Sequence, residues 1–329
     1  MTSSLTKRVS VNGCCVLVTG GAGFIGSHLV DKLLAEGARQ VVVVDNMFLG
    51  NMANLTDALA KGVAFYREDA EFPSSLAYIF EANPIDIVFN CATKALNYSF
   101  SNPSNAFSTN TTVVLNLLEL QRRGAFRTLC HFSTSEVYGS AAYEPMDEAH
   151  PIAPTTAYAA GKAAADLAVQ SYVRMFDVDA YIVRPFNNYG PRQNDTGILA
   201  GVIPATARRI LEGEAPIIFG DGLQCRDFIH VADTVQAVLD CHRMLPAGES
   251  ANISAENAIS ICELVSKIAQ HFGYKGEILR APERNADVRC HKATSAKLRG
   301  LTGFAPRPFE EGLEQTLNWY MEQRAKVGR

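Results

Sequence analysis

Short apolar runs alternate with longer amphipathic stretches along the first 190 residues of the chain. The runs predict β-strands over residues 14–19, 40–45, 63–67, 86–91, 128–133 and 180–184. Their nearly continuous apolar character is typical of strands buried on both faces, as in a parallel sheet covered by helices. Helical periodicity lies between them, over residues 27–36, 105–122 and 158–176. This alternation predicts right-handed β-α-β units and an α/β fold with a doubly wound parallel sheet.

The pattern changes after about residue 190, where prolines separate shorter elements. These prolines are Pro191, Pro204, Pro216, Pro246, Pro282, Pro306 and Pro308. We therefore expect a first domain over residues 1–188, with the segment 226–254 packing back on it. Residues 189–329 are expected to form a smaller α/β substrate lobe. Such a lobe would cover the carboxyl ends of the strands, where open α/β sheets bind ligands.

Composition narrows the classes of partner. The chain has 329 residues, 47% of them apolar, which is enough for a large core. A net charge of −4 provides no general attraction for nucleic acid or an anionic membrane. No apolar run approaches the roughly 20 residues that span a bilayer, and the first residues contain no secretory signal pattern. We expect a cytoplasmic protein with neither nucleic-acid nor membrane partners.

Cysteine and histidine spacing indicates no metal centre. The eight cysteines contain no C-x-x-C pair, and the seven histidines contain no H-x-x-x-H spacing. These are the patterns from which zinc sites are usually recognised. We therefore expect reduced, mostly buried thiols and no metal ligands.

The sharpest motif is a glycine-rich turn at residues 19–26, TGGAGFIG, between a predicted strand and a predicted helix. Gly21, Gly23 and Gly26 satisfy G-x-G-x-x-G. One glycine permits the tight turn, one allows backbone amides to approach a pyrophosphate, and one allows close helix packing. Asp45 follows the second strand about 20 residues later, where its carboxylate can accept hydrogen bonds from ribose hydroxyls and repel a 2′-phosphate. The pattern predicts a Rossmann-like domain that binds NAD rather than NADP.

A second constellation indicates hydride-transfer chemistry. Tyr158 and Lys162 stand four residues apart on one helical face, and residues 133–139, STSEVYG, follow the fifth predicted strand. Oxidation of a carbinol needs a base, and an unperturbed tyrosine with a pKa of about 10 is a poor one at neutral pH. A neighbouring ammonium and the charge of oxidised nicotinamide would favour the phenolate. Thr134 can donate a hydrogen bond to the same substrate oxygen.

Taken together, these motifs resemble a known family. TGGAGFIG, Asp45, Asp69, STSEVYG, YAAGK and RPFNNYGP occur in the order found in the extended short-chain dehydrogenases that act on nucleotide sugars. These enzymes are nucleotide-sugar epimerases, 4,6-dehydratases and uronate decarboxylases, and the resemblance extends from about Val16 to Tyr320. It implies NAD that is reduced and reoxidised within one turnover. It also implies a homodimer formed by the helices after the fourth and fifth strands.

The resemblance implies roles for particular residues. Thr134, Tyr158 and Lys162 match the catalytic hydroxyl, base and lysine, and Glu136 is a further catalytic candidate. Asp69 is placed to meet the adenine amino group. The expected cofactor-binding residues are Gly20, Gly23, Phe24, Ile25, Gly26, Asp45, Asn46, Asp69, Ala70, Lys94, Tyr158 and Lys162.

The expected substrate-binding residues are Ser99, Thr134, Ser135, Asn187, Arg226 and Arg284. Asn187 and the two arginines match residues that contact the substrate diphosphate, and guanidinium groups suit that role because they bind phosphate in a bidentate manner. The segment 89–99 departs from the family pattern. It has Asn90 in place of the usual histidine and is one residue shorter before Ser99, while Lys94 is expected near the cofactor ribose.

Glu136 bears on the reaction, because 4-epimerases often carry a small or neutral residue at its position. Dehydratases use a glutamate there as the base at C5, and decarboxylases carry one too. Ser135 stands where dehydratases have an acid, and the YAAGK motif differs from that of decarboxylases. The sequence GDGLQCRDFIHVAD looks more like the epimerases. We expect a 4-epimerase of a UDP-hexose or UDP-hexuronate. Uronate decarboxylation and 4,6-dehydration are the alternatives, and a non-catalytic NAD-binding module is a more distant one.

Overall fold

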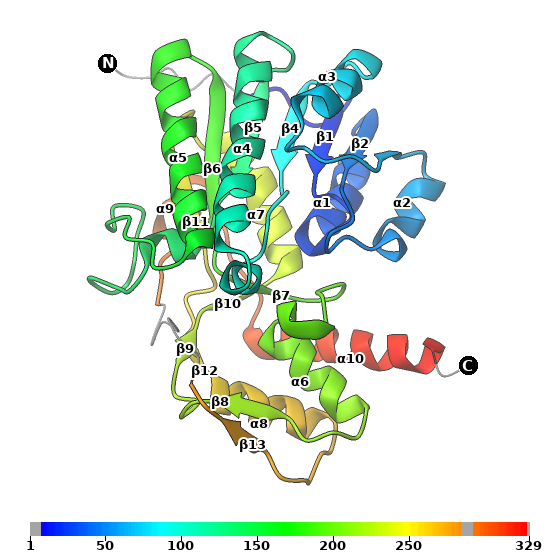
Figure 1. Ribbon diagram of the computed structural model, residues 1–329, viewed down its shortest axis with the longest axis vertical. Coiled ribbons are helices and arrows are strands. Elements are labelled where there is room, and N and C mark those ends of the chain that lie inside the picture. Colours follow the sequence, from blue (N-terminus) through cyan, green and yellow to red (C-terminus); the bar gives the residue numbers. More distant parts are fainter. Residues whose placement is uncertain (1–7, 284–291, 328–329) are drawn as a thin grey trace.

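The structure is a computed structural model that describes residues 8–283 and 292–327. Its body is a seven-stranded sheet with the strand order β11-β6-β5-β4-β1-β2-β3 (Figure 1). All neighbouring strands in it run parallel. The strands are β1 (Cys15–Thr19), β2 (Gln40–Val44), β3 (Ala64–Tyr66), β4 (Ile87–Asn90), β5 (Thr128–Phe132), β6 (Asp179–Pro185) and β11 (Ser250–Ile253). The predicted doubly wound α/β fold is confirmed.

Helices cover both faces of this sheet. One layer contains α1 (Phe24–Ala35), α2 (Thr56–Ala60), α7 (Val231–Met244) and α9 (Ala296–Thr302). The other contains α3 (Pro73–Ala82), α4 (Pro103–Arg122) and α5 (Ala157–Phe176). In Figure 1, α4 and α5 lie side by side in front of the sheet.

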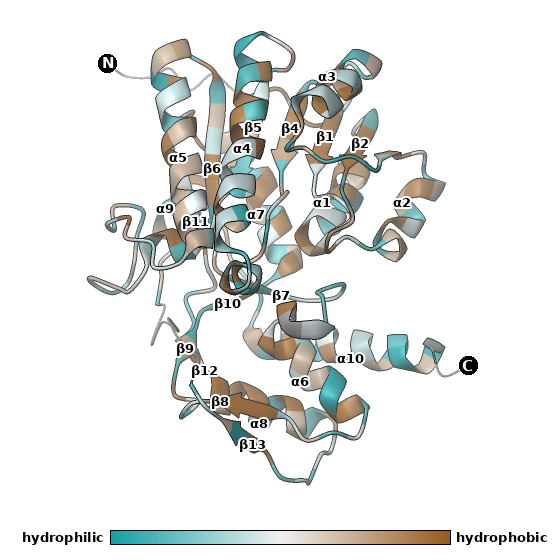
Figure 2. Ribbon diagram, in the orientation of Figure 1, coloured by the Kyte–Doolittle hydropathy of each residue, from teal (hydrophilic) through white to brown (hydrophobic). Residues whose placement is uncertain are grey.

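The side chains of β1 point alternately to the two faces of the sheet, which explains why the strands are apolar along their whole length. Val16 and Val18 pack into the core shared with α1 and α7. Cys15 and Leu17 pack into the core shared with α3, α4 and α5. Because successive side chains of a strand point to opposite faces, a strand between two helical layers needs apolar residues at every position. Figure 2 shows this as hydrophobic colouring along the central strands.

A smaller lobe lies beyond the carboxyl ends of the strands, in the lower half of Figure 1. Its helices are α6 (Val202–Leu211), α8 (Ile261–His271) and α10 (Phe309–Val327). Its short strands pair as β7 (Asn187–Tyr189) with β10 (Phe228–His230), β8 (Ile217–Phe219) with β13 (Leu279–Ala281), and β9 (Cys225–Arg226) with β12 (Ile259–Ser260). A separate apolar cluster joins α6, α8 and α10.

The chain passes between the sheet and the lobe more than once. After β10 it returns as α7, which packs on α1, and as β11, which pairs with β6. It then forms α8 in the lobe before α9 packs against α7 and β11. Within the described ranges, none of the helices has both the length and the apolar character needed to cross a membrane.

Candidate active site

A cavity of about 540 Å³ opens at the carboxyl ends of the central strands. Its lining includes Gly20 after β1, Asp45 after β2, Cys91 after β4 and Ser133 after β5. Parallel strands end at the same edge of a sheet, so residues far apart in sequence meet there. The cavity also receives side chains from α5, from the loop after β7, and from α10.

The glycine turn is built for close approach of a ligand. Gly20 has a φ of +69°, and a Cβ there would lie 2.8 Å from the backbone nitrogen of Ala92. A Cβ at Gly26 would collide with the carbonyl of Gly20. Gly23, the N-cap of α1, offers no side-chain partner to the first amides of the helix. Those amides face a cavity that Phe24 helps to line, which fits the pyrophosphate of a dinucleotide.

Asp45 connects the glycine turn to the end of β2. Its carboxylate accepts the N–H of Ala22 at 3.0 Å and that of Met47 at 2.8 Å. Burial raises its pKa, and Asp69 acts in the same direction. Asn46 donates to the carboxylate of Asp69 at 2.8 Å and so links the loops after β2 and β3. Asp45, Asn46 and Asp69 all line the cavity, with acceptor oxygens suited to ribose and adenine.

Thr134 and Tyr158 meet in the same cavity. Thr134 caps the 3₁₀ helix η3 (Ser135–Tyr138), and its hydroxyl oxygen accepts the N–H of Glu136 at 3.2 Å. The first turn of α5, which carries Tyr158, is capped by Thr156. Burial raises the pKa of Tyr158 to about 12, while hydrogen bonds with Thr134 and Thr93 act to lower it. The phenol and the Thr134 hydroxyl therefore lie in the same part of the cavity, at the end of β5.

Lys162 faces the backbone of β5. Its Nζ donates to the carbonyl of Phe132 at 2.7 Å, and its side chain is buried. Burial lowers its pKa to about 8, whereas the charge of Asp166 acts to raise it. Burial raises the pKa of the Tyr158 phenol, and the expectation that an ammonium and oxidised nicotinamide favour its phenolate stays a prediction.

A buried polar chain runs behind Lys162. Arg184 donates to Asp166 at 3.0 Å and to the hydroxyl of Tyr138 at 2.9 Å. Tyr138 in turn donates to Asn252 at 2.7 Å. These residues come from β6, α5, η3 and β11, so the chain fixes the catalytic helix against the strand ends.

Asn90, which stands in place of the usual histidine, links three neighbouring strands through its side chain. Its Oδ1 accepts the hydroxyl of Thr19 at 2.6 Å, and its Nδ2 lies 3.3 Å from Nδ1 of His131. His131 is fully buried, and burial lowers its pKa well below the ordinary value. A neutral imidazole on β5 thus lies beside Asn90 on β4.

Lys94 is held at the cavity wall by Asn110. The Asn110 side chain accepts the N–H of Lys94 at 2.9 Å and donates to its carbonyl at 3.2 Å. The Lys94 ammonium lies 3.8 Å from the ring centre of Phe48, which follows β2. Ser99, in the 3₁₀ helix η2 (Leu96–Phe100), donates to the carbonyl of Leu96 at 2.7 Å and does not line the cavity.

The predicted cofactor-binding residues lie together around the cavity, whereas most of the predicted substrate-binding residues lie outside its lining. Within the described ranges, the cavity is lined by Gly20, Gly23, Phe24, Ile25, Gly26, Asp45, Asn46, Asp69, Ala70, Lys94, Thr134, Tyr158 and Lys162. Ser99, Ser135, Glu136, Asn187 and Arg226 lie outside its lining. Arg284 lies outside the described residues. Glu136 is nevertheless close enough to Tyr158 for its charge to raise the phenol's pKa.

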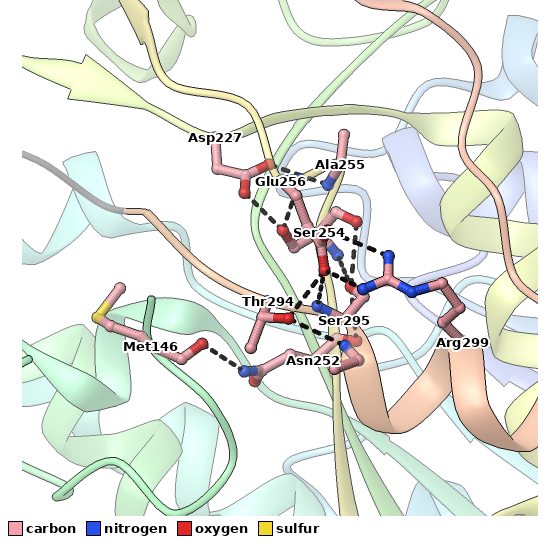
Figure 3. A network of polar contacts seen from close by, with 10 residues as sticks. Met146, Asp227, Asn252, Ser254, Ala255, Glu256, Thr294, Ser295 and Arg299 are labelled. Atoms are coloured by element: carbon pink, nitrogen blue, oxygen red, sulfur yellow. Dashed lines mark hydrogen bonds and ion pairs between the residues drawn. The ribbon is translucent and has the colours of Figure 1, made fainter. Parts of the chain in front are cut away.

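The predicted diphosphate residues of the lobe are positioned through Asp227. Both the backbone N–H and the side chain of Asn187 donate to the Asp227 carbonyl, at 3.0 and 3.3 Å. The buried Asp227 carboxylate accepts the hydroxyl of Ser254 and the N–H of Ala255 (Figure 3). Burial raises its pKa to about 7. Arg226 lies beside it, so Asp227 fixes the backbone that carries the expected phosphate contacts.

Figure 3 shows that this network continues to the start of α9. Glu256 accepts hydrogen bonds from the Thr294 hydroxyl, the Ser295 backbone and the Arg299 guanidinium. Asn252 donates to the carbonyl of Met146, whose segment forms a bridge with residue 293. The network thus ties the segment around Met146 and the start of α9 to the end of β11.

Sequence reasoning missed many residues that line the cavity, among them Thr93, Arg192 and Trp319. Arg192 pairs with Asp31 of α1 at 2.8 Å, and its Nη1 is buried without a hydrogen-bond partner among the described residues. A cation that lines the same cavity as the N-terminus of α1 suits an anionic ligand. Arg192 directly follows the RPFNNYGP motif, which was a usable signal. Nothing in the local sequence marked Trp319, which reaches the cavity from α10.

These features define a dinucleotide site joined to a hydroxyl, a phenol and a lysine, as in a dehydrogenase. Residues 16–254 match the model of the NAD dependent epimerase/dehydratase family. The UDP-glucose 4-epimerase of Mycolicibacterium smegmatis is 32% identical, over 92% of this chain and 97% of that protein. The UDP-glucuronic acid decarboxylase 1 of Xenopus tropicalis is 33% identical, over 94% of this chain and 72% of that protein.

Solved structures agree. DesIV, a dTDP-glucose 4,6-dehydratase from Streptomyces venezuelae solved with NAD bound, has a TM-score of 0.89 to this structure. It is 30% identical, and the match covers 95% of this chain and 98% of that one. The chain belongs to the NAD-dependent epimerase/dehydratase family; it is an enzyme, and NAD is its cofactor. These relatives have similar identities to this chain, and they are an epimerase, a decarboxylase and a dehydratase. Their similarity therefore does not distinguish among the three reactions.

Proposed function

We propose that the protein is a nucleotide-sugar 4-epimerase acting on a UDP-hexose or UDP-hexuronate. The observation that carries this proposal is the arrangement around the phenol. Thr134 and Tyr158 line the cavity, and Ser135 beside Thr134 stands where the 4,6-dehydratases carry an acid. Epimerisation at C4 needs a proton acceptor for the 4-hydroxyl and no base at C5. The side chains that line the cavity supply that single requirement.

NAD would be held by the glycine turn, the first amides of α1, Asp45 and Arg192. When bound, it supplies an acceptor and then a donor for the hydride of the sugar's C4. Gly20 and Gly26 leave room for the pyrophosphate, since a Cβ at either would strike backbone atoms. The buried Nη1 of Arg192 is a cation with unused hydrogen-bonding capacity at this cavity. The residues therefore fit a dinucleotide.

Tyr158 would take the proton of the sugar's 4-hydroxyl and return it after the 4-keto sugar has turned over. Its pKa of about 12 must fall for this role. The Lys162 ammonium and the positive charge of oxidised nicotinamide both act in that direction. The hydroxyl oxygen of Thr134 already accepts the N–H of Glu136, so its own proton is available to the sugar oxygen.

The substrate diphosphate would be held by Asn187, Arg226 and Arg284. Support comes from the Asp227 carbonyl, which accepts two hydrogen bonds from Asn187 and fixes its side chain. Arg226 stands on strand β9, which pairs with β12. Guanidinium groups bind diphosphate with bidentate hydrogen bonds, which suits a protein of net charge −4.

We also propose that the enzyme is a cytoplasmic homodimer formed through α4 and α5. The outer faces of these helices expose large apolar side chains, including Phe107, Leu115 and Leu167. Leu167 is 62% exposed. Large exposed apolar patches are uncommon on monomers and usually mark an interface. Light scattering should give the mass of a dimer, and Leu167→Asp should shift it toward the monomer.

Every cysteine among the described residues is a free thiol, in line with a reducing compartment.

Uronate decarboxylation is the second candidate. It is favoured by Glu136, whose charge reaches the phenol of Tyr158, and by the 33% identity to a UDP-glucuronic acid decarboxylase. Incubation with UDP-, dTDP-, GDP- and CDP-sugars, followed by product mass measurement, separates the reactions. Conversion without a mass change is expected of the epimerase. Loss of carbon dioxide or of water would overturn that proposal in favour of decarboxylation or dehydration.

A further inference from the structure

Among the described residues, the lining of the cavity contains three basic side chains, and Lys94 is held differently from the other two. Lys162 donates to the carbonyl of Phe132, and Arg192 pairs with Asp31. Within the same part of the chain, the Lys94 ammonium has neither a hydrogen-bond acceptor nor an acidic partner, although the residue is only 8% exposed. Burying an ammonium is costly unless other groups compensate for the lost water.

Two aromatic rings take the place of such partners. Nζ of Lys94 lies 3.8 Å from the ring centre of Phe48 and 5.7 Å from that of Tyr98. Both distances are within the roughly 6 Å over which a ring face attracts a cation. The two rings meet edge to face, with their centres 5.0 Å apart and their planes at 73°. Phe48 and Tyr98 thus form an aromatic seat for Lys94.

The aromatic seat leaves the charge of Lys94 available to a ligand. A ring carries no net charge, so it attracts the ammonium without neutralising it. The cavity is already lined by the acidic side chains of Asp45, Glu68, Asp69 and Asp195. A further carboxylate beside Lys94 would repel an anionic ligand, whereas a ring does not. The arrangement therefore suits the pyrophosphate of a dinucleotide.

Phe48 is tied to the ribose side of the cavity. Its N–H donates to Oδ1 of Asn46 at 3.0 Å, and Asn46 donates to Asp69 at 2.8 Å. The Phe48 side chain lines the cavity and is 40% exposed, so it does not belong to the core. The backbone of Lys94 is fixed separately by the side chain of Asn110. Loss of the Phe48 ring should therefore release the ammonium without moving the loop that carries it.

We propose that Phe48 is a positioning residue for the cofactor: its ring, together with that of Tyr98, holds the Lys94 ammonium where it attracts the pyrophosphate of NAD. The inference rests on the expected place of Lys94 beside the cofactor, and it does not depend on the reaction at the sugar. The loop after β2 then acts on two parts of the dinucleotide, through Asp45 at the ribose and through Phe48 and Lys94 at the phosphates. A side chain that is already held in place loses less conformational freedom when the ligand binds.

Affinity for NAD provides the first test, by calorimetric titration of the full chain freed of bound nucleotide. Phe48→Leu keeps an apolar side chain but removes the ring face. The affinity should fall about fivefold, the effect expected when one long side chain must be ordered on binding. Phe48→Tyr keeps the ring and should bind NAD like the parent. In a Lys94→Met background Phe48→Leu should have no further effect, because the ring acts through the ammonium.

Shorter probes and a matched control locate the effect. Phe48→Leu should weaken the binding of ADP as it weakens that of NAD, and it should leave the binding of adenosine, which has no phosphate, unchanged. Phe176→Leu is the control, because Phe176 is 42% exposed and its ring lies 5.3 Å from the guanidinium of Arg122. Phe176 ends α5 outside the cavity lining, so this variant should bind all three probes like the parent.

Nuclear magnetic resonance tests the aromatic seat without any ligand. Protons above a ring face are shifted upfield by the ring current. In protein containing ¹³C-labelled lysine, the ε-methylene signal of Lys94 is assigned by its absence in Lys94→Met. This signal should lie upfield of the other lysines and return toward them in Phe48→Leu, while the thermal midpoint changes little.

Four outcomes overturn the inference: an unchanged NAD affinity in Phe48→Leu, an equal loss with adenosine, an equal loss in the Lys94→Met background, or an ordinary Lys94 signal in the parent. The second and third would mean that Phe48 contacts the adenosine itself. If Lys94→Met binds NAD like the parent, the expected role of Lys94 is wrong as well, so the two failures are distinguishable. Should Phe48→Leu fail to fold, Phe48→Met carries the same prediction.

Discussion

The guanidinium of Arg184 on β6 donates through Nε to the carboxylate of Asp166 on α5 at 3.0 Å, with both side chains only 4% exposed. Asp166 stands one helical turn after Lys162, and its charge acts to raise the pKa of that lysine. The ion pair therefore supports the catalytic helix mechanically and electrostatically. A charge left alone in such a place is costly, because water cannot solvate it.

Asp166→Ala should strongly destabilise the protein. The change leaves the Arg184 charge buried without its partner, which typically costs about 3–5 kcal/mol. Thermal or urea unfolding measures the loss. The double variant Asp166→Leu/Arg184→Met should recover much of the stability, because it leaves no unpaired charge. A single variant as stable as the parent would show that the pair is not structural.

Asp45→Ala should weaken NAD binding and narrow the preference for NAD over NADP. The carboxylate repels a 2′-phosphate, and it also holds the glycine turn through the N–H of Ala22. Calorimetric titration of both dinucleotides gives the two affinities. Asp57→Ala, on the surface helix α2, is the control and should change neither. If the unmodified protein binds NADP more tightly than NAD, the role given to Asp45 is wrong.

Glu136→Gln tests the reaction. In a 4-epimerase Glu136 only shapes the surroundings of the phenol, so the variant should keep substantial turnover. A dehydratase or decarboxylase variant should reduce NAD and then stall, and absorbance of the reduced nicotinamide would accumulate.

Turnover in deuterated water gives an independent answer on the unmodified enzyme. An epimerase that returns the hydride directly puts no solvent deuterium on carbon, whereas dehydration delivers it to C6 and decarboxylation to C5. Mass spectrometry of the product decides. Carbon-bound deuterium would rule out the proposed epimerisation.

Asp227 should make stability depend on pH. Its pKa is about 7 in the folded protein, above the ordinary aspartate value of 3.8. The folded state therefore binds more protons than the unfolded chain between about pH 4 and pH 7. Its contribution is fully present below pH 4 and is lost as the pH rises through 7.

Asp227→Asn removes this titration while keeping an oxygen for the N–H of Ala255. The variant should gain stability relative to the parent by roughly 2–4 kcal/mol as the pH rises from 4 to 8. Thermal midpoints measured across that range give the comparison. Parallel curves for the two proteins would mean that Asp227 keeps an ordinary pKa.

The sequence by itself determined the features that depend on neighbouring residues. Apolar runs located the strands β1 to β6 to within one residue at each end, because a strand between two helical layers must be apolar at successive positions. The glycine turn was recognisable because a pyrophosphate must approach the backbone closely. Asp45 was recognisable because the carboxylate that binds the ribose follows the next strand of the β-α-β unit. The i, i+4 spacing of Tyr158 and Lys162 follows from helical geometry.

Only the tertiary structure decided what depends on contacts between distant segments. Arg192 meets Asp31, Thr93 lines the same cavity as Tyr158, and Trp319 reaches that cavity from α10, although no local pattern joins these positions. The Lys162 ammonium bonds the carbonyl of Phe132, and burial lowers the pKa of Lys162 and raises that of the Tyr158 phenol. Burial and hydrogen-bond partners are properties of the packed interior, so they arise only when strands and helices far apart in the chain come together.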